Sequence, residues 1–262
     1  MATPFKSVSP KRRAAVAAVA LLAVLAGGCG SSDSGKSGST TAASTSASSL
    51  APVHGSYSPT IDPANFVTTI DNRWFPLKPG TGFHYKGVRG STPQTDDEIV
   101  THQTKQILGI RCTVVRDTVS EHGIAIERTF DWYAQDKQGN VWYMGELALE
   151  RKRGRFVKAS DSWESGVNGA KPGVIMPGNP RRGDAYRQEY YPPGQALDEA
   201  HVLGSAPVKA PYGAFKHSLV TSEFSPLEPQ TEQKYYVAGL GEVAERVVKG
   251  HREQFELVSV TR

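Results

Sequence analysis

The chain has 262 residues, of which 30 are Lys or Arg and 26 are Asp or Glu, and its formal net charge is +4. Four basic residues lie before residue 14 and no acidic residue lies before Asp33, so the chain after residue 28 has equal numbers of basic and acidic residues. A neutral chain lacks a general attraction for phosphate backbones, which argues against a nucleic acid as partner.

Residues 1–28 have the pattern of a bacterial lipoprotein signal peptide. A basic stretch precedes an apolar run at residues 14–26, which is shorter than the about 20 residues that a membrane-spanning helix needs. The run ends in Leu25-Ala26-Gly27-Gly28-Cys29, which resembles the bacterial lipobox except for Ala26, where Leu is commonest. We therefore expect Cys29 to carry acyl chains such as palmitate and to anchor the protein to the outer face of the cell membrane. The alternative is an ordinary secretory signal with an incidental cysteine.

Residues 29–52 follow as a predicted tether. After the cysteine they are almost entirely Ser, Thr, Gly and Ala, which bury too little apolar surface to offset chain entropy. We expect a disordered linker with a root-mean-square reach of about 25 Å.

Residues 53–262 are predicted to form a single β-rich domain, because apolar and polar residues alternate with period two between regular turn signals. We expect an antiparallel meander that forms a strongly curved sheet, half-barrel or open barrel, with few short helices. Residues 195–203 are also compatible with a short helix. The expected strands are 81–89, 98–107, 111–120, 124–135, 141–149, 184–191, 200–208, 216–224, 233–238, 241–248 and 253–260.

The clearest element is a hairpin that turns at residues 136–140. Gly139 can take the positive φ that a bulged hairpin turn needs. Asp131, Asp136 and Asn140 could be imagined as an oxygen-rich calcium loop. We favour ordinary turn chemistry, in which Asp136 binds the turn backbone and Asn140 takes a left-handed conformation. Seven scattered histidines give no zinc set, so no metal or cofactor is expected.

One face of this hairpin is apolar and is a candidate ligand wall. Its residues are Phe130, Trp132, Trp142 and Met144. The even positions of the first strand, which include Phe130 and Trp132, are expected to point into the curved sheet. Core packing is the competing interpretation and is favoured over ligand binding.

No sequence motif indicates a catalytic centre, but Asp131, Glu146 and Glu189 are weak candidates for an acid/base pair. If the hairpin pairs symmetrically about Gln138, Glu146 faces Phe130 on the apolar side, where desolvation would raise its pKa. The competing interpretation is a strand end that reaches solvent or a salt bridge. The remaining cysteine, Cys112, lies among aliphatic residues and is expected to be buried and inert.

Three motifs resemble an uncharacterised family of secreted bacterial proteins and lipoproteins. They are Phe75-Pro76-Leu77-Lys78-Pro79-Gly80-Thr81, the segment 131–143 (DWYAQDKQGNVWY) and Pro211-Tyr212-Gly213-Ala214-Phe215, and the likeness spans about residues 61–248. The family implies no activity. Its strand pattern is similar to that of periplasmic lipoprotein carriers and mycobacterial lipid-binding lipoproteins, half-barrels that hold acyl chains against a concave face.

Together these patterns favour a non-enzymatic, membrane-anchored envelope lipoprotein that binds an apolar or amphipathic, lipid-like ligand or a partner protein. A hydrolase that acts on envelope glycan or lipid through the candidate carboxylates is the alternative. A scaffold without a pocket remains a third interpretation.

Overall fold

The computed structural model describes residues 47–227 and 229–262, so the expected signal peptide, Cys29 and most of the tether lie outside the described residues. The helical elements of the described residues are short: the α-helical turn α1 (Ala47–Leu50) and the 3₁₀ turns Pro63–Asn65 and Pro192–Gly194. The strands are β1 (Phe66–Val67), β2 (Gly82–Arg89), β3 (Thr92–Ile107), β4 (Ile110–Glu121), β5 (Ile124–Asp136), β6 (Val141–Lys152), β7 (Arg155–Lys158), β8 (Trp163–Glu164), β9 (Lys171–Met176), β10 (Ala185–Arg187), β11 (Glu189–Tyr190), β12 (Glu199–Ala210), β13 (Gly213–Phe224), β14 (Thr231–Val237), β15 (Gly241–Lys249) and β16 (Glu253–Thr261).

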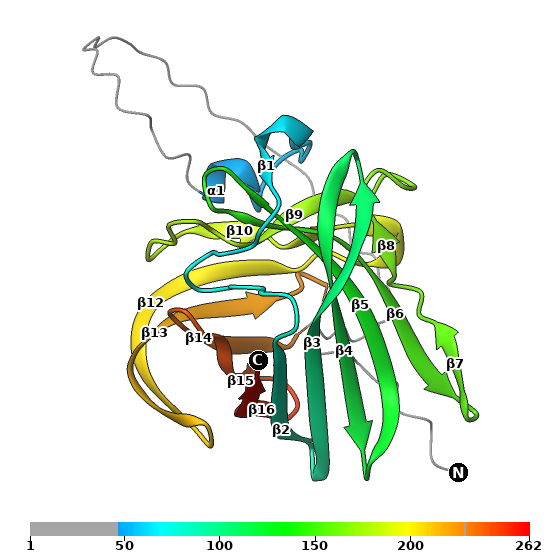
Figure 1. The fold of residues 1–262 in the computed structure, drawn as a ribbon, viewed down its shortest axis with the longest axis vertical. Coiled ribbons are helices and arrows are strands. Elements are labelled where there is room, and N and C mark those ends of the chain that lie inside the picture. The colour runs from blue at the N-terminus through cyan, green and yellow to red at the C-terminus, as the bar shows by residue number, and fades with distance from the viewer. Residues whose placement is uncertain (1–46, 228) are drawn as a thin grey trace, which may run out of the picture.

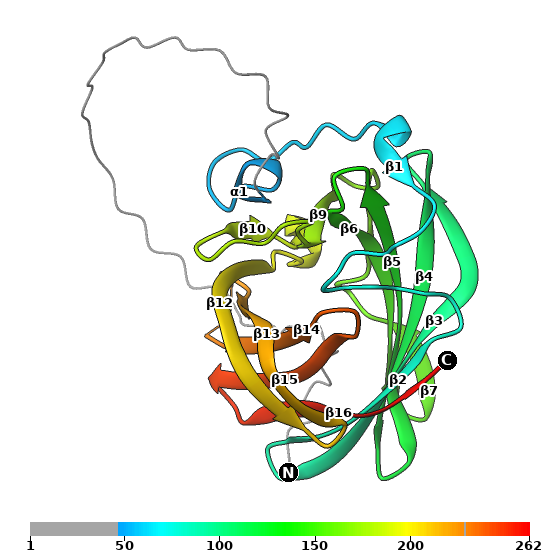
Figure 2. The same ribbon diagram turned by 60° about the vertical axis from the view of Figure 1, so that its left-hand side comes forward.

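The strands form one antiparallel sheet that curls into a nearly closed barrel (Figures 1 and 2). The order is β10-β12-β13-β14-β15-β16-β2-β3-β4-β5-β6-β9-β11, with β1 on β5 and with β7 and β8 on β6. Consecutive hairpins build both halves, and β16 pairs with β2 to join them. The predicted fold class, mainly β with few short helices, is confirmed.

Most predicted strands match the structure. The predicted strand 184–191 is divided into β10 and β11, which pair with β12 and β9, and the short strands β1, β7 and β8 were not expected. The Pro/Gly-rich segment before residue 183 contributes β9, which lies beside β6 and was not expected. The possible helix at residues 195–203 is wrong, because Gln195 takes a left-handed conformation and β12 starts at Glu199. Backbone pairing of β12 with β13 outweighs the local helix propensity of this segment.

The folded part begins earlier than the expected boundary at residue 53. Ala51 is fully buried, and its carbonyl accepts a hydrogen bond from the Arg187 N–H at 2.8 Å. The Arg187 guanidinium also donates to the Pro52 carbonyl, at 2.9 Å from Nε. Residues 47–52 are therefore part of the domain rather than of a disordered tether.

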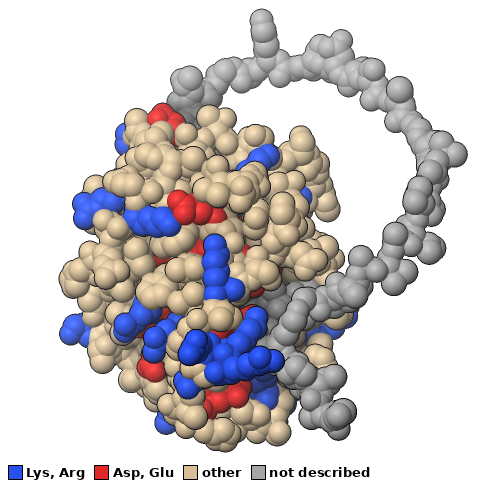
Figure 3. All heavy atoms as spheres, turned by 90° about the vertical axis from the view of Figure 1, so that its right-hand side faces the viewer, with Lys and Arg blue, Asp and Glu red and all other residues tan. Residues whose placement is uncertain are grey.

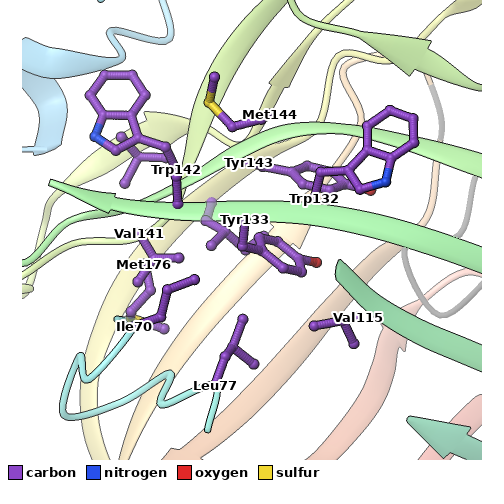
Figure 4. Close-up of a cluster of buried hydrophobic side chains, with 14 of the residues drawn as sticks. Ile70, Leu77, Val115, Trp132, Tyr133, Val141, Trp142, Tyr143, Met144 and Met176 are labelled. Carbon is purple, nitrogen blue, oxygen red and sulfur yellow. The ribbon is translucent and has the colours of Figure 1, made fainter. Parts of the chain in front are cut away.

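The core follows the β5–β6 hairpin and the coil before β2. Figure 4 shows side chains of this core, among them Tyr133, Tyr143 and Met144 from the hairpin and Leu77 from the coil. Cys112 is buried, as predicted, and desolvation raises the pKa of its thiol to about 12. Among residues 47–227 and 229–262, no helix is long and apolar enough to cross a membrane.

Candidate functional site

The inner face of β5 is polar, which reverses the predicted orientation of this strand. Asp131 and Tyr133 line an interior cavity together with residues of β2, β4 and β14. Phe130 and Trp132 lie on the opposite face of the strand, and in Figure 4 Trp132 and Tyr133 point away from each other. The expectation that the aromatic side chains of β5 fill the interior was wrong. The odd-numbered residues of this strand, which include Asp131, are the more buried set and face inward.

A one-residue bulge in β6 brings two of the candidate carboxylates together. Tyr133 pairs with Tyr143, but Trp132 pairs with Gly145, so Asp131 then pairs with Glu146. The symmetric register predicted about Gln138 is therefore wrong beyond the bulge, and Glu146 faces the interior rather than Phe130. Glycine is needed at position 145, where φ is +138° and a Cβ atom would lie 2.5 Å from the Trp163 carbonyl oxygen.

A single tyrosine hydroxyl bridges the two carboxylates. Tyr143 Oη lies 2.6 Å from Asp131 Oδ1 and 2.8 Å from Glu146 Oε2, and all three side chains are buried. A phenol carries one hydrogen, so both contacts are hydrogen bonds only when one carboxyl group also carries a proton. Burial, followed by the nearby charges of Asp131 and Glu146, raises the pKa of Tyr143 well above its ordinary value.

Glu189 lies in the same interior but is held by a different partner. Its Oε2 accepts a hydrogen bond of 2.9 Å from the Trp163 indole, whose ring packs edge-on against Tyr143 at 5.2 Å. The structure therefore brings Asp131 and Glu146 into one hydrogen-bonded group, and the Trp163 ring links Glu189 to that group through aromatic packing.

A buried lysine, which sequence reasoning missed, lies on the opposite wall of the barrel. Lys234 Nζ is 3.2 Å from Glu223, 3.6 Å from Glu232 and 3.7 Å from Glu245. Burial alone would lower the pKa of Lys234, but these negative charges hold it well above its ordinary value. Burial would likewise raise the pKa of Glu223, but Lys234 lowers it. The signal was present in β14, whose inward positions alternate as acid, base and aromatic residue.

The space between these walls is small. One cavity of about 40 Å³ lies between Lys234 and a set of acidic side chains, and a second of about 20 Å³ lies beside Glu223 and Glu232. Cavities of this size hold a few water molecules, so the interior has no room for an acyl chain. The acidic side chains that line the larger cavity are Asp96, Glu98, Asp117, Asp131, Glu242 and Glu245.

Two carboxyl groups at this cavity have strongly raised pKa values. For Asp117 the main cause is burial, followed by the charge and hydrogen bond of Asp96. For Glu242 it is again burial, which Lys234 offsets only in part. Phe75, from the first of the sequence motifs, also lines this cavity and packs edge-on against Tyr133 on one wall and Tyr236 on another, at ring distances of 5.4 and 6.4 Å.

A larger groove lies at one end of the barrel, between the chain before β1 and the β5–β6 turn. We call it the end groove, and its volume is about 740 Å³. Its apolar lining is Leu50, Pro52, Tyr57, Pro59, Ile61, Phe66 and Trp142, and its polar lining is Ser49, Ser56, Ser58, Thr60, Asp62, Asn65, Asp136, Gln138 and Asn140. Figure 2 shows the N-terminal segment passing across this end of the barrel.

Asp136 holds the turn at the floor of the end groove. Its carboxylate accepts hydrogen bonds from the backbone N–H groups of Gln138 and Asn140, from the Asn140 amide and from the Trp142 indole, at 2.8 to 3.0 Å. The predicted turn role of Asp136 is confirmed, as is the positive φ of Gly139. Asn140 does not take a left-handed conformation, which corrects that expectation, and instead its side chain joins Asp136 to Gly178. No cluster of three or more His, Cys, Asp or Glu suited to a metal ion occurs in the described part of the chain.

The four predicted ligand-wall residues do not share one surface. Trp142 lines the end groove, whereas Phe130 lines a separate groove on the outer face of β2 to β5. Trp132 is covered by Lys105, whose Nζ lies 3.5 Å from the ring centroid, and Met144 is fully buried. Of the four, Trp142 alone is among the residues that line the end groove.

No family model and no curated protein matches the chain. Two solved structures are similar to it. One, from Bacteroides fragilis, is described as an exported protein with a YmcC-like fold, at 12% identity over 73% of this chain and 100% of that chain, with a TM-score of 0.39. The other, from Parabacteroides distasonis, is described as a lipoprotein, at 9% identity over 73% of this chain and 100% of that chain, with a TM-score of 0.38. Likeness at this level does not bear on the function of the chain.

Proposed function

We propose that this protein is a membrane-anchored, extracytoplasmic lipoprotein that binds one amphipathic ligand in the end groove. The observation that carries the proposal is the groove itself, whose volume of about 740 Å³ lies within the roughly 300 to 1,000 Å³ usual for small-molecule sites. Anchoring rests on the lipobox-like sequence at Cys29.

The lining of the end groove suits a ligand with an apolar part and a polar head. Phe66 offers aromatic surface, and its ring packs edge-on against Trp142 at 6.3 Å; Tyr57 and Trp142 border the groove but are themselves buried. Amide and hydroxyl groups such as those of Asn65 and Gln138 lie beside them and can fix a polar head by hydrogen bonds. The barrel interior is not the site in this proposal, because its cavities hold only water-sized molecules.

Binding can be tested with a matched pair of substitutions. Ile61 borders the end groove, whereas Val248 is 55% exposed on β15, near the tip of β2 at the other end of the sheet. We expect Ile61→Arg to weaken binding of a zwitterionic fluorescent lysophospholipid at least tenfold and Val248→Arg to change it less than twofold. Equal binding by both variants, or no saturable binding by the wild type, would refute the ligand site.

Anchoring is tested separately in the host. The Cys29→Ala form should be released from the membrane fraction. Full-length Cys29→Ala protein that stays membrane-bound would contradict acylation as the anchor.

The hydrolase alternative gains no support from the geometry. Asp131 and Glu146 are close enough to work as a pair, but both are buried and the cavity beside Asp131 admits only water-sized molecules. A glycan or lipid cannot reach them in this conformation, so we do not propose catalysis.

A further inference from the structure

Acidic and basic side chains are distributed unequally between the interior and the surface. Of the described residues, twelve acidic side chains are buried but only two basic ones, Arg187 and Lys234. The side chains that are not buried are therefore 23 basic and 12 acidic ones. The surface is therefore cationic although the chain as a whole is nearly neutral. The earlier inference from net charge, that the protein has no general attraction for phosphate groups, was wrong. The buried acidic residues are Asp96, Asp117, Glu127, Asp131, Asp136, Glu146, Glu189, Glu199, Glu223, Glu232, Glu245 and Glu253.

Part of this excess gathers on the outer face of β4 to β7, which we call the basic face. It consists of Arg116, Arg128, Arg151 and Lys158, with Phe130, Leu149 and Phe156 between them. The register places these residues side by side, since Arg116 pairs with Phe130, and Leu149 pairs with both Arg128 and Lys158. In Figure 3 basic side chains gather in the lower part of this side of the molecule.

Arginine and aromatic groups are in direct contact on the basic face. The Arg128 guanidinium carbon lies 4.5 Å from the Phe156 ring centroid. Arg116, Arg128 and Phe130 also line an open groove of about 610 Å³ on the outside of β2 to β5. The groove thus combines two guanidinium groups, which suit phosphate oxygens, with apolar surface.

Two neighbouring acidic side chains have other polar partners. Glu150 Oε2 lies 2.7 Å from Lys152, and Asp97 Oδ1 lies 2.7 Å from the His84 ring. None of the four basic side chains of the basic face is in an ion pair with either of these acids. The guanidinium groups of Arg116 and Arg128 are exposed and can take an anionic partner.

We propose that the basic face docks on anionic phospholipids of the membrane that carries the protein, with lipid phosphate groups held by Arg116 and Arg128. Exposed arginines interleaved with apolar side chains match the boundary between headgroups and acyl chains, where both groups are satisfied. This inference rests on the proposed function only in that the anchor keeps the domain near a bilayer.

Docking can be measured with a fluorescent probe on the basic face. Full-length protein with Leu149→Cys, between Arg128 and Lys158, is labelled with an environment-sensitive dye. Protein without that substitution gives the background, since Cys112 is buried and acylation blocks the Cys29 thiol. The protein is reconstituted with phosphatidylcholine vesicles that contain or lack phosphatidylglycerol. We expect the probe to enter an apolar environment only with phosphatidylglycerol and only at low salt.

Matched charge reversals decide between docking and a nonspecific effect. Each basic residue at an anionic surface contributes about fivefold to binding, so Arg116→Glu/Arg128→Glu should weaken docking at least about 25-fold. Lys209→Glu/Lys216→Glu, the same charge change on exposed residues of β12 and β13, should weaken it far less. Equal responses to both lipids, equal effects of both double variants, or binding to soluble heparin without binding to vesicles would each overturn the proposal. Flotation with neutral vesicles measures binding through the lipid anchor alone. This measurement distinguishes a protein that lacks the anchor from one whose basic face does not dock.

Discussion

Lys234 Nζ lies 3.2 Å from Glu223 Oε2 inside the barrel, and each side chain is only 5% exposed. Glu223 in turn accepts hydrogen bonds from Thr221 and Tyr236, at 2.6 and 3.1 Å. This network joins the neighbouring strands β13 and β14 on the inner face of the barrel, where Lys234 offsets part of the negative charge of the buried glutamates. A barrel wall built in this way depends on polar matching rather than on apolar packing alone.

Removal of the buried lysine charge should be severely destabilising. Lys234→Met leaves Glu223 and its acidic neighbours buried without their cation, and we expect a loss of about 3 to 5 kcal/mol in the free energy of unfolding. Urea denaturation measures the loss, and exposed Lys209→Met serves as the control. Adding Glu223→Gln to Lys234→Met should recover part of the stability. A Lys234→Met protein as stable as the control would contradict the buried network.

Stability should fall as the pH rises from about 5 to 8. Asp117 and Glu242 have pKa values raised by burial, so the folded state keeps protons that the unfolded state has already released. His201 acts in the opposite direction, because burial lowers its pKa, but it is neutral in both states above about pH 7. Unfolding free energies measured from pH 7 to pH 8 should therefore decrease. Asp117→Asn should flatten this slope, whereas Asn at exposed Asp62 should leave it unchanged.

The shared hydroxyl of Tyr143 should stabilise the protein measurably. Tyr143→Phe removes the hydrogen-bond partner of two buried carboxyl groups while it keeps the ring that packs on Tyr133. We expect a loss of about 2 to 4 kcal/mol in the free energy of unfolding. Tyr235→Phe, whose hydroxyl only donates to Gln233 on a half-exposed face, should cost less than about 1 kcal/mol. Similar losses for the two variants would argue against the bridging role.

The bulge in β6 should not tolerate a side chain. Gly145→Ala combines a disfavoured φ with a close approach to the Trp163 backbone, and we expect thermal unfolding at a clearly lower temperature. Gly123 also has a positive φ but no atom within 4 Å of a Cβ, so Gly123→Ala should cost only about 1 kcal/mol. If the two substitutions lowered the unfolding temperature equally, steric contact at the bulge would be ruled out as the cause.

Much of the strand layout could be predicted from local signals. Period-two alternation and turn residues gave the long hairpins, and the turn at Asp136 and Gly139 was predicted with its chemistry. These features depend on residues close in sequence. The short strand β9 was missed because its Pro and Gly residues hide the pairings that β6 and β11 provide.

The inner surface could not be predicted, because it depends on long-range compensation. Apolar residues on one face of β5 suggested that this face points inward, but Asp131 on the other face accepts a hydrogen bond from Tyr143, a residue of the next strand. A single bulge residue also moved Glu146 from one face to the other. The alternation of residues along one strand predicts neither the partners of a buried charged group nor the position of a bulge.

The concealment of acidic groups within the barrel affects how the molecule behaves as a colloid. The folded domain exposes more basic than acidic side chains to a resin or a counterion, although the formal charges of its residues nearly cancel. Cation-exchange media should retain it at neutral pH, and denaturant should release it as the hidden carboxyl groups meet water. Its isoelectric behaviour is thus a property of the tertiary structure rather than of composition.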